Sequence, residues 1–379
     1  MDYTEFAFEP EIITRETNGG LVLLRVIVSN RPYYSTLSSK REYFIYDARA
    51  AKLDHLPHPG CQHELDERTV AIVCKCHQHC QRTTSSSSHL DSDGFTLRHH
   101  GTACQEHHHD CTYVVAAQAL RFGGPETSHL CMYHSDIKTW SRKPVVVNRC
   151  PHHHITSKTL TIRGDKGTVA WIDLWRTIIF CDVIDKQPKV CCLKLPKAIM
   201  PTKAVGIGDP RSVRDIAVIG NFIKFVDMHN HFDNSSQASQ HWEAATWSIR
   251  TGSFFPKDWT RDHHINSTHI PPPSSLYKLM VDAGIKAAHP TLSTLYVGLP
   301  NISPQNDAIV YFLAKIDYRD HTAWVLALDM RNKTVKEVSP FDGKRTLGLG
   351  RGYDASRISA YLKPAVGRKR IPKRPGIPC

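Results

Sequence analysis

The chain has 379 residues, of which 41% are hydrophobic and 22% are charged. This composition provides for a sizeable core and excludes a chain that is disordered throughout. The 48 Lys and Arg residues exceed the 36 Asp and Glu residues, but a diffuse excess of this size does not by itself indicate nucleic-acid binding.

The acidic N-terminus lacks the apolar run of a secretory signal, so no such signal is expected. No stretch of 18 apolar residues occurs, so no transmembrane helix is expected. In an unsecreted chain the 12 cysteines should be mostly reduced. We expect Cys181, Cys191 and Cys192, which lie in apolar strand-like runs, to be small core residues.

A repeated pattern of an apolar or aromatic run, a polar turn and a second short strand predicts five β-hairpins. Asp, Asn and Gly suit the turns, and proline, which cannot donate to a ladder, closes most copies. The five hairpins cover residues 43–57, 130–147, 178–196, 245–256 and 324–340. Further predicted strands cover residues 21–28, 69–73, 113–117, 168–172, 216–219, 222–226, 292–297 and 309–316.

Strands that recur at intervals of about ten residues indicate a sandwich, a barrel or a propeller. The five similar hairpins favour a propeller, in which the outer strands of each four-stranded blade form such a hairpin. We therefore predict an all-β fold, a propeller-like array of four-stranded antiparallel units with six blades. A β-sandwich or two β domains are the alternatives.

Helix is predicted to be scarce, and the best candidate is Ala355–Leu362 with Asp354 as its cap. The low-complexity pieces Ser85–Ser88 and Pro271–Ser275 are predicted surface loops. One domain is expected over residues 1–362. A disordered basic tail follows at residues 363–379, which contain six basic residues and no acidic one.

A family resemblance begins at Gly167-Thr-Val-Ala-Trp171-Ile-Asp173-Leu-Trp175-Arg176 and continues to Val183. This segment resembles the signature of a plant family catalogued as domain of unknown function 1618. Arg214–Val226 and Thr246–Ser248 resemble the next two blocks of that family. The resemblance is strong from about Gly167 to Asp262. It implies a plant protein without established catalytic residues, similar to the propeller domains of F-box proteins, although no F-box helices are visible.

The stretch from Cys74 to Cys111 is rich in residues that can bind metals. Zinc takes four such ligands in a tetrahedron, but here no Cys-x2-Cys pair faces a second one. We interpret residues 74–111 as a loop insertion, and we interpret the runs His107–His109 and His152–His154 as exposed histidines. The residues in question are Cys74, Cys76, His77, His79, Cys80, Cys104, His107, His108, His109 and Cys111.

Common catalytic motifs are missing from the sequence, including Gly-x-Ser-x-Gly, His-Glu-x-x-His and the phosphate loop. Gly348–Gly352 is interpreted as a flexible turn and not as a nucleotide cradle. We therefore assign no catalytic, cofactor-binding or metal-binding residue. An enzyme with its site in the propeller channel and a zinc-bearing regulatory protein remain alternatives, because strands can bring distant residues together.

Two short segments have alternative interpretations. The basic residues of Gly367–Pro375 resemble a nuclear localisation patch or a solvated end, and without aromatic residues they do not favour nucleic-acid binding. Trp175 is either an exposed binding anchor or, as we favour, a cap on the core, with Arg176 paired to Asp173 or Asp182.

Taken with the missing catalytic motifs, the propeller prediction favours a non-enzymatic protein-interaction module. We expect a monomer in the cytoplasm or the nucleus that binds a protein partner, without a cofactor and without membrane or nucleic-acid binding.

Overall fold

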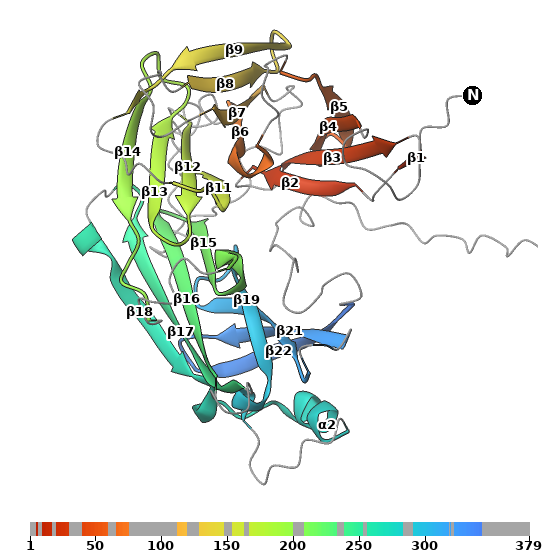
Figure 1. Cartoon of the computed structure of the whole chain (residues 1–379), viewed down its shortest axis with the longest axis vertical. Helices are drawn as coiled ribbons and strands as arrows, with labels where there is room; N and C mark the ends of the chain where they lie inside the picture. Colours follow the sequence, from red (N-terminus) through yellow and green to blue (C-terminus); the bar gives the residue numbers. More distant parts are fainter. Residues whose placement is uncertain are drawn as a thin grey trace, which may run out of the picture.

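The computed structural model describes residues 5–6, 10–16, 20–29, 40–59, 66–75, 112–119, 129–147, 154–162, 167–199, 208–232, 239–252, 256–282, 291–317, 319 and 322–342. These residues form five β-sheets, which we call sheets A to E in chain order. The sheets follow one another along an arc, with sheet A and sheet E at its two ends (Figure 1).

Each sheet is made of strands that are close together in the sequence. Sheet A contains β1 (Glu5–Phe6), β2 (Glu11–Arg15), β3 (Leu21–Ser29), β4 (Lys40–Asp47) and β5 (Lys52–Leu56). Sheet B contains β6 (Val70–Cys74), β7 (Tyr113–Ala119), β8 (His129–His134) and β9 (Thr139–Pro144). Sheet C contains β10 (Val146–Val147), β11 (Lys158–Thr161), β12 (Thr168–Asp173), β13 (Thr177–Asp182) and β14 (Lys189–Lys194).

The second half of the chain forms the other two sheets and the helix α2 (Ser274–Asp282). Sheet D contains β15 (Arg214–Ile219), β16 (Phe222–Phe232), β17 (Ser239–Arg250) and β18 (Thr260–Asn266). Sheet E contains β19 (Tyr296–Ile302), β20 (Ile309–Lys315), β21 (Thr322–Asp329) and β22 (Thr334–Asp342). Short 3-10 helices cover Glu67–Thr69, Pro210–Ser212, Pro256–Asp258, Ser267–His269 and Leu292–Thr294.

Every sheet contains a run of antiparallel strands in chain order, which is the topology of a propeller blade. The all-β propeller arrangement is therefore confirmed, but the prediction of six blades was wrong, because the described residues form five. Val70 pairs with Ala117, so residues 75–112 join two neighbouring strands of sheet B and do not lead to another blade. Sheet C also departs from four antiparallel strands, since β10 pairs with β14 in parallel.

The core consists of apolar layers between successive sheets. Because strand residues alternate in direction, each sheet contributes one set of side chains to the layer before it and one to the layer after it. Val169 and Trp171 lie in the layer between sheets B and C, whereas Ala170 and Ile172 lie in the layer between sheets C and D. This is the alternation predicted for β12.

Tryptophan indoles join neighbouring sheets at four places, in each case by donating Nε1–H to a backbone carbonyl oxygen near or in the next sheet. The four pairs are Trp140 to Pro57 at 2.8 Å, Trp171 to Thr69 at 2.7 Å, Trp259 to Lys194 at 3.0 Å and Trp242 to Leu292 at 3.1 Å. A buried carbonyl left without a partner destabilises a fold, so these bonds fix how adjacent blades pack.

The adjacent residues Arg214 and Asp215 at the start of β15 tie sheet D to both neighbours. Asp215 accepts a hydrogen bond from the Ile302 backbone N–H at 2.9 Å, in sheet E, and pairs with the Lys158 ammonium at 2.5 Å, in sheet C. Arg214 pairs with Asp227 at 2.6 Å, and both side chains are almost fully buried. The two residues belong to one of the family blocks recognised in the sequence.

Four of the five predicted hairpins are confirmed as β4–β5, β8–β9, β13–β14 and β21–β22. In the fourth copy the turn leads instead to β18, which begins at Thr260. The helix α2 begins inside the predicted loop Pro271–Ser275, because Leu276 and Met280 form a one-turn apolar pair that packs into the core between sheets D and E. The predicted helix Ala355–Leu362 lies outside the described residues.

The expectation of a buried core cysteine is confirmed for Cys181. Cys191 is a free cysteine as expected, but it is exposed, so the expected core position was wrong. Cys192 is disulfide-bonded, so the expectation of a reduced thiol was wrong for it. Among the described residues, no helix has the length and apolar character needed to cross a membrane.

Candidate functional site

Most residues of the segment interpreted as a loop insertion, from Cys76 to Cys111, lie outside the described residues, as do Gly348–Gly352 and the basic tail. His154 is described and is half-buried, so the interpretation as an exposed histidine was wrong for this residue. Its Nδ1 lies 3.1 Å from the Thr177 hydroxyl, and burial lowers the pKa of His154 to about 4 against the opposing charge of Asp173. In the described part of the chain, no three His, Cys, Asp or Glu side chains are placed to hold a metal ion.

The turn that contains Trp175 matches the favoured interpretation. Asp173 is buried, accepts a hydrogen bond from the Trp175 backbone N–H at 2.9 Å and pairs with the Arg176 guanidinium at 3.4 Å. The half-buried Trp175 ring lies against the Arg214 guanidinium, 4.8 Å from its centroid. Trp175 therefore covers the buried ion pair between Arg214 and Asp227. The charged side chains that have no ion-pair partner among the described residues lie in another part of the molecule.

Sheet D carries a polar surface because its central hairpin is longer than those beside it. Strands β16 and β17 have 11 and 12 residues, whereas β12 and β13 of sheet C have 6 each. At about 3.3 Å per residue, the difference makes β16 and β17 roughly 17–20 Å longer than β12 and β13. The layer between sheets C and D includes Phe225 and Ala245, and beyond them the same side of the hairpin carries polar residues.

We call this side of sheet D the D flank. It presents His229, His231, His241, Glu243 and His264 from three strands. The His231 ring stacks on the His241 ring with centroids 4.2 Å apart, and His229 lies edge-on to His231 at the same distance. Burial and the neighbouring His231 lower the pKa of His229. The three rings of His229, His231 and His241 therefore form an aromatic surface along the hairpin.

Glu243 lies at the centre of the D flank and both of its carboxylate oxygens are used. Oε1 accepts a hydrogen bond from His231 Nε2 at 2.9 Å and Oε2 accepts one from His264 Nε2 at 2.8 Å. Burial favours the neutral acid, but these two hydrogen bonds outweigh it and lower the pKa of Glu243. The carboxylate is ionised at neutral pH and already bonded on both sides.

A β-bulge in β18 brings Arg261 and His264 to the same side of the sheet. Residues three positions apart in a regular strand point in opposite directions. Here His263 pairs with Thr246 while Arg261 pairs with the next residue, Trp247, so Asp262 is the additional residue. The bulge therefore places Arg261 and His264 together beside Trp247.

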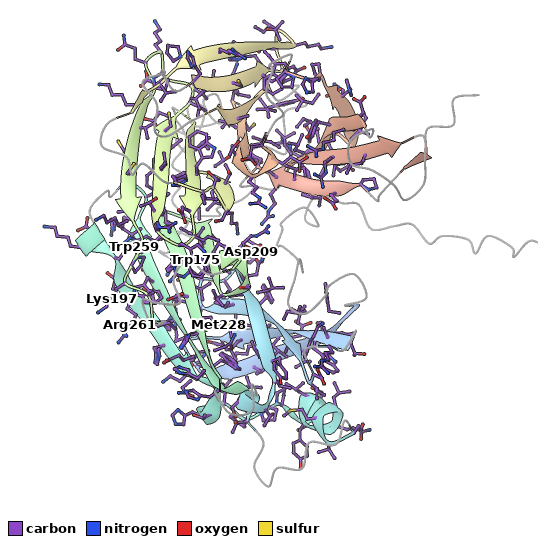
Figure 2. The ribbon with its side chains drawn as sticks, viewed as in Figure 1. Trp175, Lys197, Asp209, Met228, Trp259 and Arg261 are labelled. Atoms are coloured by element: carbon purple, nitrogen blue, oxygen red, sulfur yellow. The ribbon has the colours of Figure 1, made fainter. Side chains whose placement is uncertain are left out.

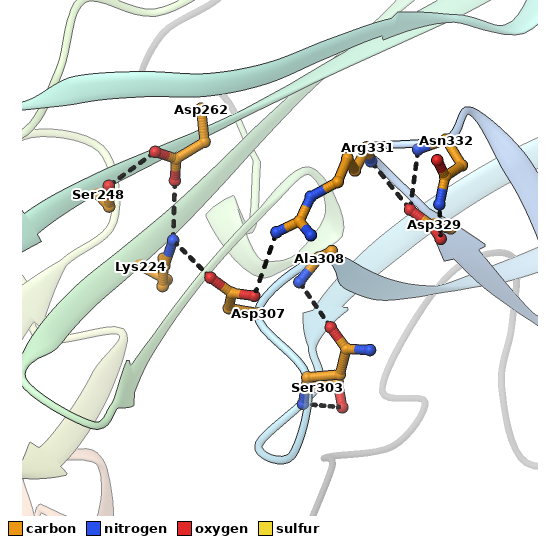
Figure 3. A network of polar contacts seen from close by, with 10 residues as sticks. Lys224, Ser248, Asp262, Ser303, Asp307, Ala308, Asp329, Arg331 and Asn332 are labelled. Atoms are coloured by element: carbon orange, nitrogen blue, oxygen red, sulfur yellow. Dashed lines mark hydrogen bonds and ion pairs between the residues drawn. The ribbon is translucent and has the colours of Figure 1, made fainter. Parts of the chain in front are cut away.

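The additional residue, Asp262, is held by contacts on the opposite side of sheet D, which faces sheet E. The Asp262 carboxylate accepts a hydrogen bond from the Ser248 hydroxyl at 2.7 Å and pairs with the Lys224 ammonium at 3.0 Å (Figure 3). Lys224 also pairs with Asp307 of sheet E at 3.2 Å. The bulge is thus part of a polar network that spans two sheets.

The D flank contains a pocket between β17, β18 and the segment that follows β14. Its volume is about 540 Å³, within the range of pockets that bind small ligands or single side chains. Figure 2 shows Lys197, Arg261 and Trp259 on the side of the molecule where β18 lies. We call it the flank pocket, and it is lined by Lys197, Ala198, Ile199, Glu243, Trp247, Arg261 and His264.

The segment that carries Lys197 is fixed at both ends. The Lys194 carbonyl oxygen accepts the Trp259 indole hydrogen bond at 3.0 Å. The Ile199 backbone N–H donates to Asp227 at 2.8 Å, and Asp227 is itself held by Arg214. The pocket wall is therefore positioned by the buried ion pair near the start of sheet D, and it needs little reorganisation to bind.

The positive charges of Lys197 and Arg261 in the flank pocket are not neutralised by a carboxylate of the described residues. Among the described residues, neither Lys197 nor Arg261 has a carboxylate within ion-pair distance, and both are exposed. Glu243 does not neutralise them, because its oxygens bind the two imidazoles. The arrangement can attract an anion to the wall formed by Trp247 and Ile199.

Sequence reasoning missed every residue of the flank pocket. Strand β18 reads Thr-Arg-Asp-His-His-Ile-Asn and has no apolar run that would predict a strand. The available signal was the block Thr246–Ser248, which places Trp247 in a strand next to the unassigned polar segment.

The fold and the site together define the class: a β-propeller-like protein with a cationic pocket on the side of one blade. A family model described as a protein of unknown function, DUF1618, matches residues 171–311, which include the whole flank pocket. None of the curated proteins matches the chain.

Several solved structures match the chain at low identity and with low TM-scores. The β-propeller domain of Myceliophteria thermophila Cps50 (Swd1) is 9% identical, covers 89% of this chain and 89% of its own, and gives a TM-score of 0.35. The Kuenenia stuttgartiensis hydrazine synthase is 10% identical, with 86% and 85% covered and a TM-score of 0.31. A glycosyl hydrolase from Bacteroides ovatus is 9% identical, with 92% and 86% covered and a TM-score of 0.24.

Proposed function

We propose that this chain is a non-enzymatic protein-interaction module whose partner binds on the D flank. The observation that carries the proposal is the flank pocket, in which Lys197 and Arg261 are exposed without a carboxylate partner among the described residues. Exposed cations beside an aromatic wall on a rigid sheet are typical of binding surfaces, where Trp and Arg are enriched.

Binding explains the flank pocket better than catalysis does. The pocket lining includes no hydroxyl or thiol that could act as a nucleophile. Its only carboxylate, Glu243, is held on both oxygens, so it is poorly placed to take a proton from a substrate. Three buried carboxylates of the described residues, Asp173, Asp215 and Asp227, are each paired with a cation within the fold.

The finer features of the proposal follow from the same interpretation. We propose a single domain over residues 1–362 with a basic tail at 363–379, a monomer, and a location in the cytoplasm or the nucleus. We also propose a plant origin and a likeness to the propeller domains of F-box proteins, as the family resemblance of the sequence implies.

Affinity purification after chemical cross-linking tests the proposed function. The wild-type chain is compared with the double variant Lys197→Glu and Arg261→Glu, which reverses the charge of the flank pocket. The matched control is Lys186→Glu and Lys189→Glu, two exposed residues at the other end of β14. We expect a protein that is enriched with the wild type and the control and lost with the flank variant. Identical sets of proteins from all three would contradict a partner on the D flank.

A further inference from the structure

The chemistry of the flank pocket restricts what part of a partner it can hold. Lys197 extends from the segment after β14 and Arg261 from β18, so the two cations come from two sides of the pocket. A guanidinium and an ammonium together suit a carboxylate or a phosphate, and the guanidinium can form two parallel hydrogen bonds with either.

The pocket is larger than a bare anion requires. Its volume of about 540 Å³ leaves room for the apolar stem of a side chain beside Trp247 and Ile199. Next to it, the stacked rings of His231 and His241 extend the surface along the long hairpin. The site therefore provides contacts for a segment on either side of the charged group.

The edge of β18 argues against the addition of a partner strand. In sheet D, β18 is the last strand of the order and its outer side is not paired among the described residues. However, the bulge at Asp262 interrupts the regular pattern of N–H and C=O groups that an added strand would need. A partner segment is expected to bind through a side chain and not through main-chain pairing.

From these observations we propose that the flank pocket binds the negatively charged side chain of an extended segment of a partner protein. The charged group is a carboxylate or a phosphate, which share the same recognition by Lys197 and Arg261. This inference rests on the proposed function, since it names the chemistry of the partner at the same site.

Nuclear magnetic resonance of the ¹⁵N-labelled full chain tests the inference through the indole N–H signal of Trp247. The signal is assigned by its loss in Trp247→Phe. The probes are blocked phosphotyrosine, blocked glutamate, blocked glutamine as the neutral match for glutamate, and inorganic phosphate. We expect a saturable shift with one or both blocked anions and none with glutamine. A stronger response to phosphotyrosine indicates a phosphorylated segment, and an equal or stronger response to glutamate indicates an acidic one.

Variants connect the response to the two cations. Lys197→Ala and Arg261→Ala are each expected to weaken the binding of the anionic probe by about tenfold or more, as is typical for the loss of a charged hydrogen bond. Lys189→Ala is the control and should bind as the wild type does. Since Lys197 and Arg261 are exposed, both variants should melt at the wild-type temperature, which excludes a failure to fold.

Three results would overturn the inference: no shift with either blocked anion, equal shifts with glutamine, or binding of inorganic phosphate as strong as that of the blocked anions. The last result would identify a site for free ions. These outcomes differ from a failure of the proposed function. If the charge-reversed chain loses its partner while no anion binds, the partner surface is supported and only the anion is wrong. If anions bind but the partner is unaffected, the proposed function fails.

Discussion

Arg214 connects three features of the protein through one side chain. Its guanidinium pairs with Asp227, donates to the carbonyl oxygens of Leu174 and Trp175, and lies against the Trp175 ring. Asp227 in turn accepts the Ile199 N–H that positions the wall of the flank pocket. A buried residue of the family block thereby supports the exposed site, although it contacts no part of it.

Replacing Trp175 should test this connection. In Trp175→Ala the buried Arg214 loses an aromatic partner and becomes partly open to water, so we expect the free energy of unfolding to fall by about 2–4 kcal/mol. Trp175→Phe keeps a ring at the site and should lose less. Urea titration of the three chains measures both changes. A Trp175→Ala chain that is as stable as the wild type but fails to bind its partner would instead make Trp175 a binding anchor.

A second residue-scale prediction concerns pH and His154. The folded chain lowers the pKa of His154 to about 4 through burial, below the ordinary value of 6.5. As the pH falls from 6.5 to about 4, the unfolded chain takes up this proton first, so stability declines across that window and then levels off. The difference in pKa corresponds to at most about 3 kcal/mol.

The contribution of His154 is isolated by comparison with His154→Gln. The free energy of unfolding of both chains is measured between pH 7 and pH 4, and the wild type should lose more of it than the variant. Parallel curves for the two chains would show that burial of His154 does not control this part of the pH dependence.

At the scale of elements, the bulge in β18 builds the flank pocket by changing which side chains share a face. Deletion of Asp262 should restore a regular strand in which Arg261 still pairs with Trp247 and stays on the D flank. Asp262→Ala keeps the number of residues and removes only the bonds to Ser248 and Lys224. We expect the deletion to retain binding of the anionic probe, because Arg261 keeps its side of the sheet. We expect Asp262→Ala to retain binding with a loss of about 1–3 kcal/mol in stability.

These two variants separate the geometry of the bulge from its anchoring. The Trp247 indole signal reports probe binding, and thermal unfolding reports stability. If the deletion variant folds but no longer binds the probe, the pairing of Arg261 with Trp247 is not sufficient to place Arg261 in the pocket.

Elements with an apolar alternation could be predicted from the sequence, and those with a polar surface could not. The strand around Val169–Ile172 was predicted because both of its faces are buried between sheets. The strand around Phe222–Val226 was predicted from its apolar residues, of which Ile223, Phe225 and Val226 are buried. Strand β18 was missed since its side chains are mainly polar. The site itself depends on the register of three strands and on a bulge, and no local pattern reports either.

At the scale of the whole molecule, the class of fold was predictable because five hairpins recur with similar turns. The number of blades was not, since the spacing between the hairpins varies too widely along the chain to give a count. Residues 75–112, most of which were interpreted from the sequence as a loop insertion, lie between two paired strands of sheet B, as the pairing of Val70 with Ala117 shows. The layered cores and the indole bonds between sheets then hold the sheets in the arc of Figure 1, in which sheet D, which carries the D flank, lies between sheets C and E.

The central claim is that a partner protein binds on the D flank. Hydrogen–deuterium exchange of the full chain, with and without the partner recovered by cross-linking, tests it most directly. The account predicts slower exchange in residues 194–199 and in β17 and β18 when the partner is bound, with sheets A and B unchanged. Protection confined to sheets A and B, with unchanged exchange in β17 and β18, would contradict it.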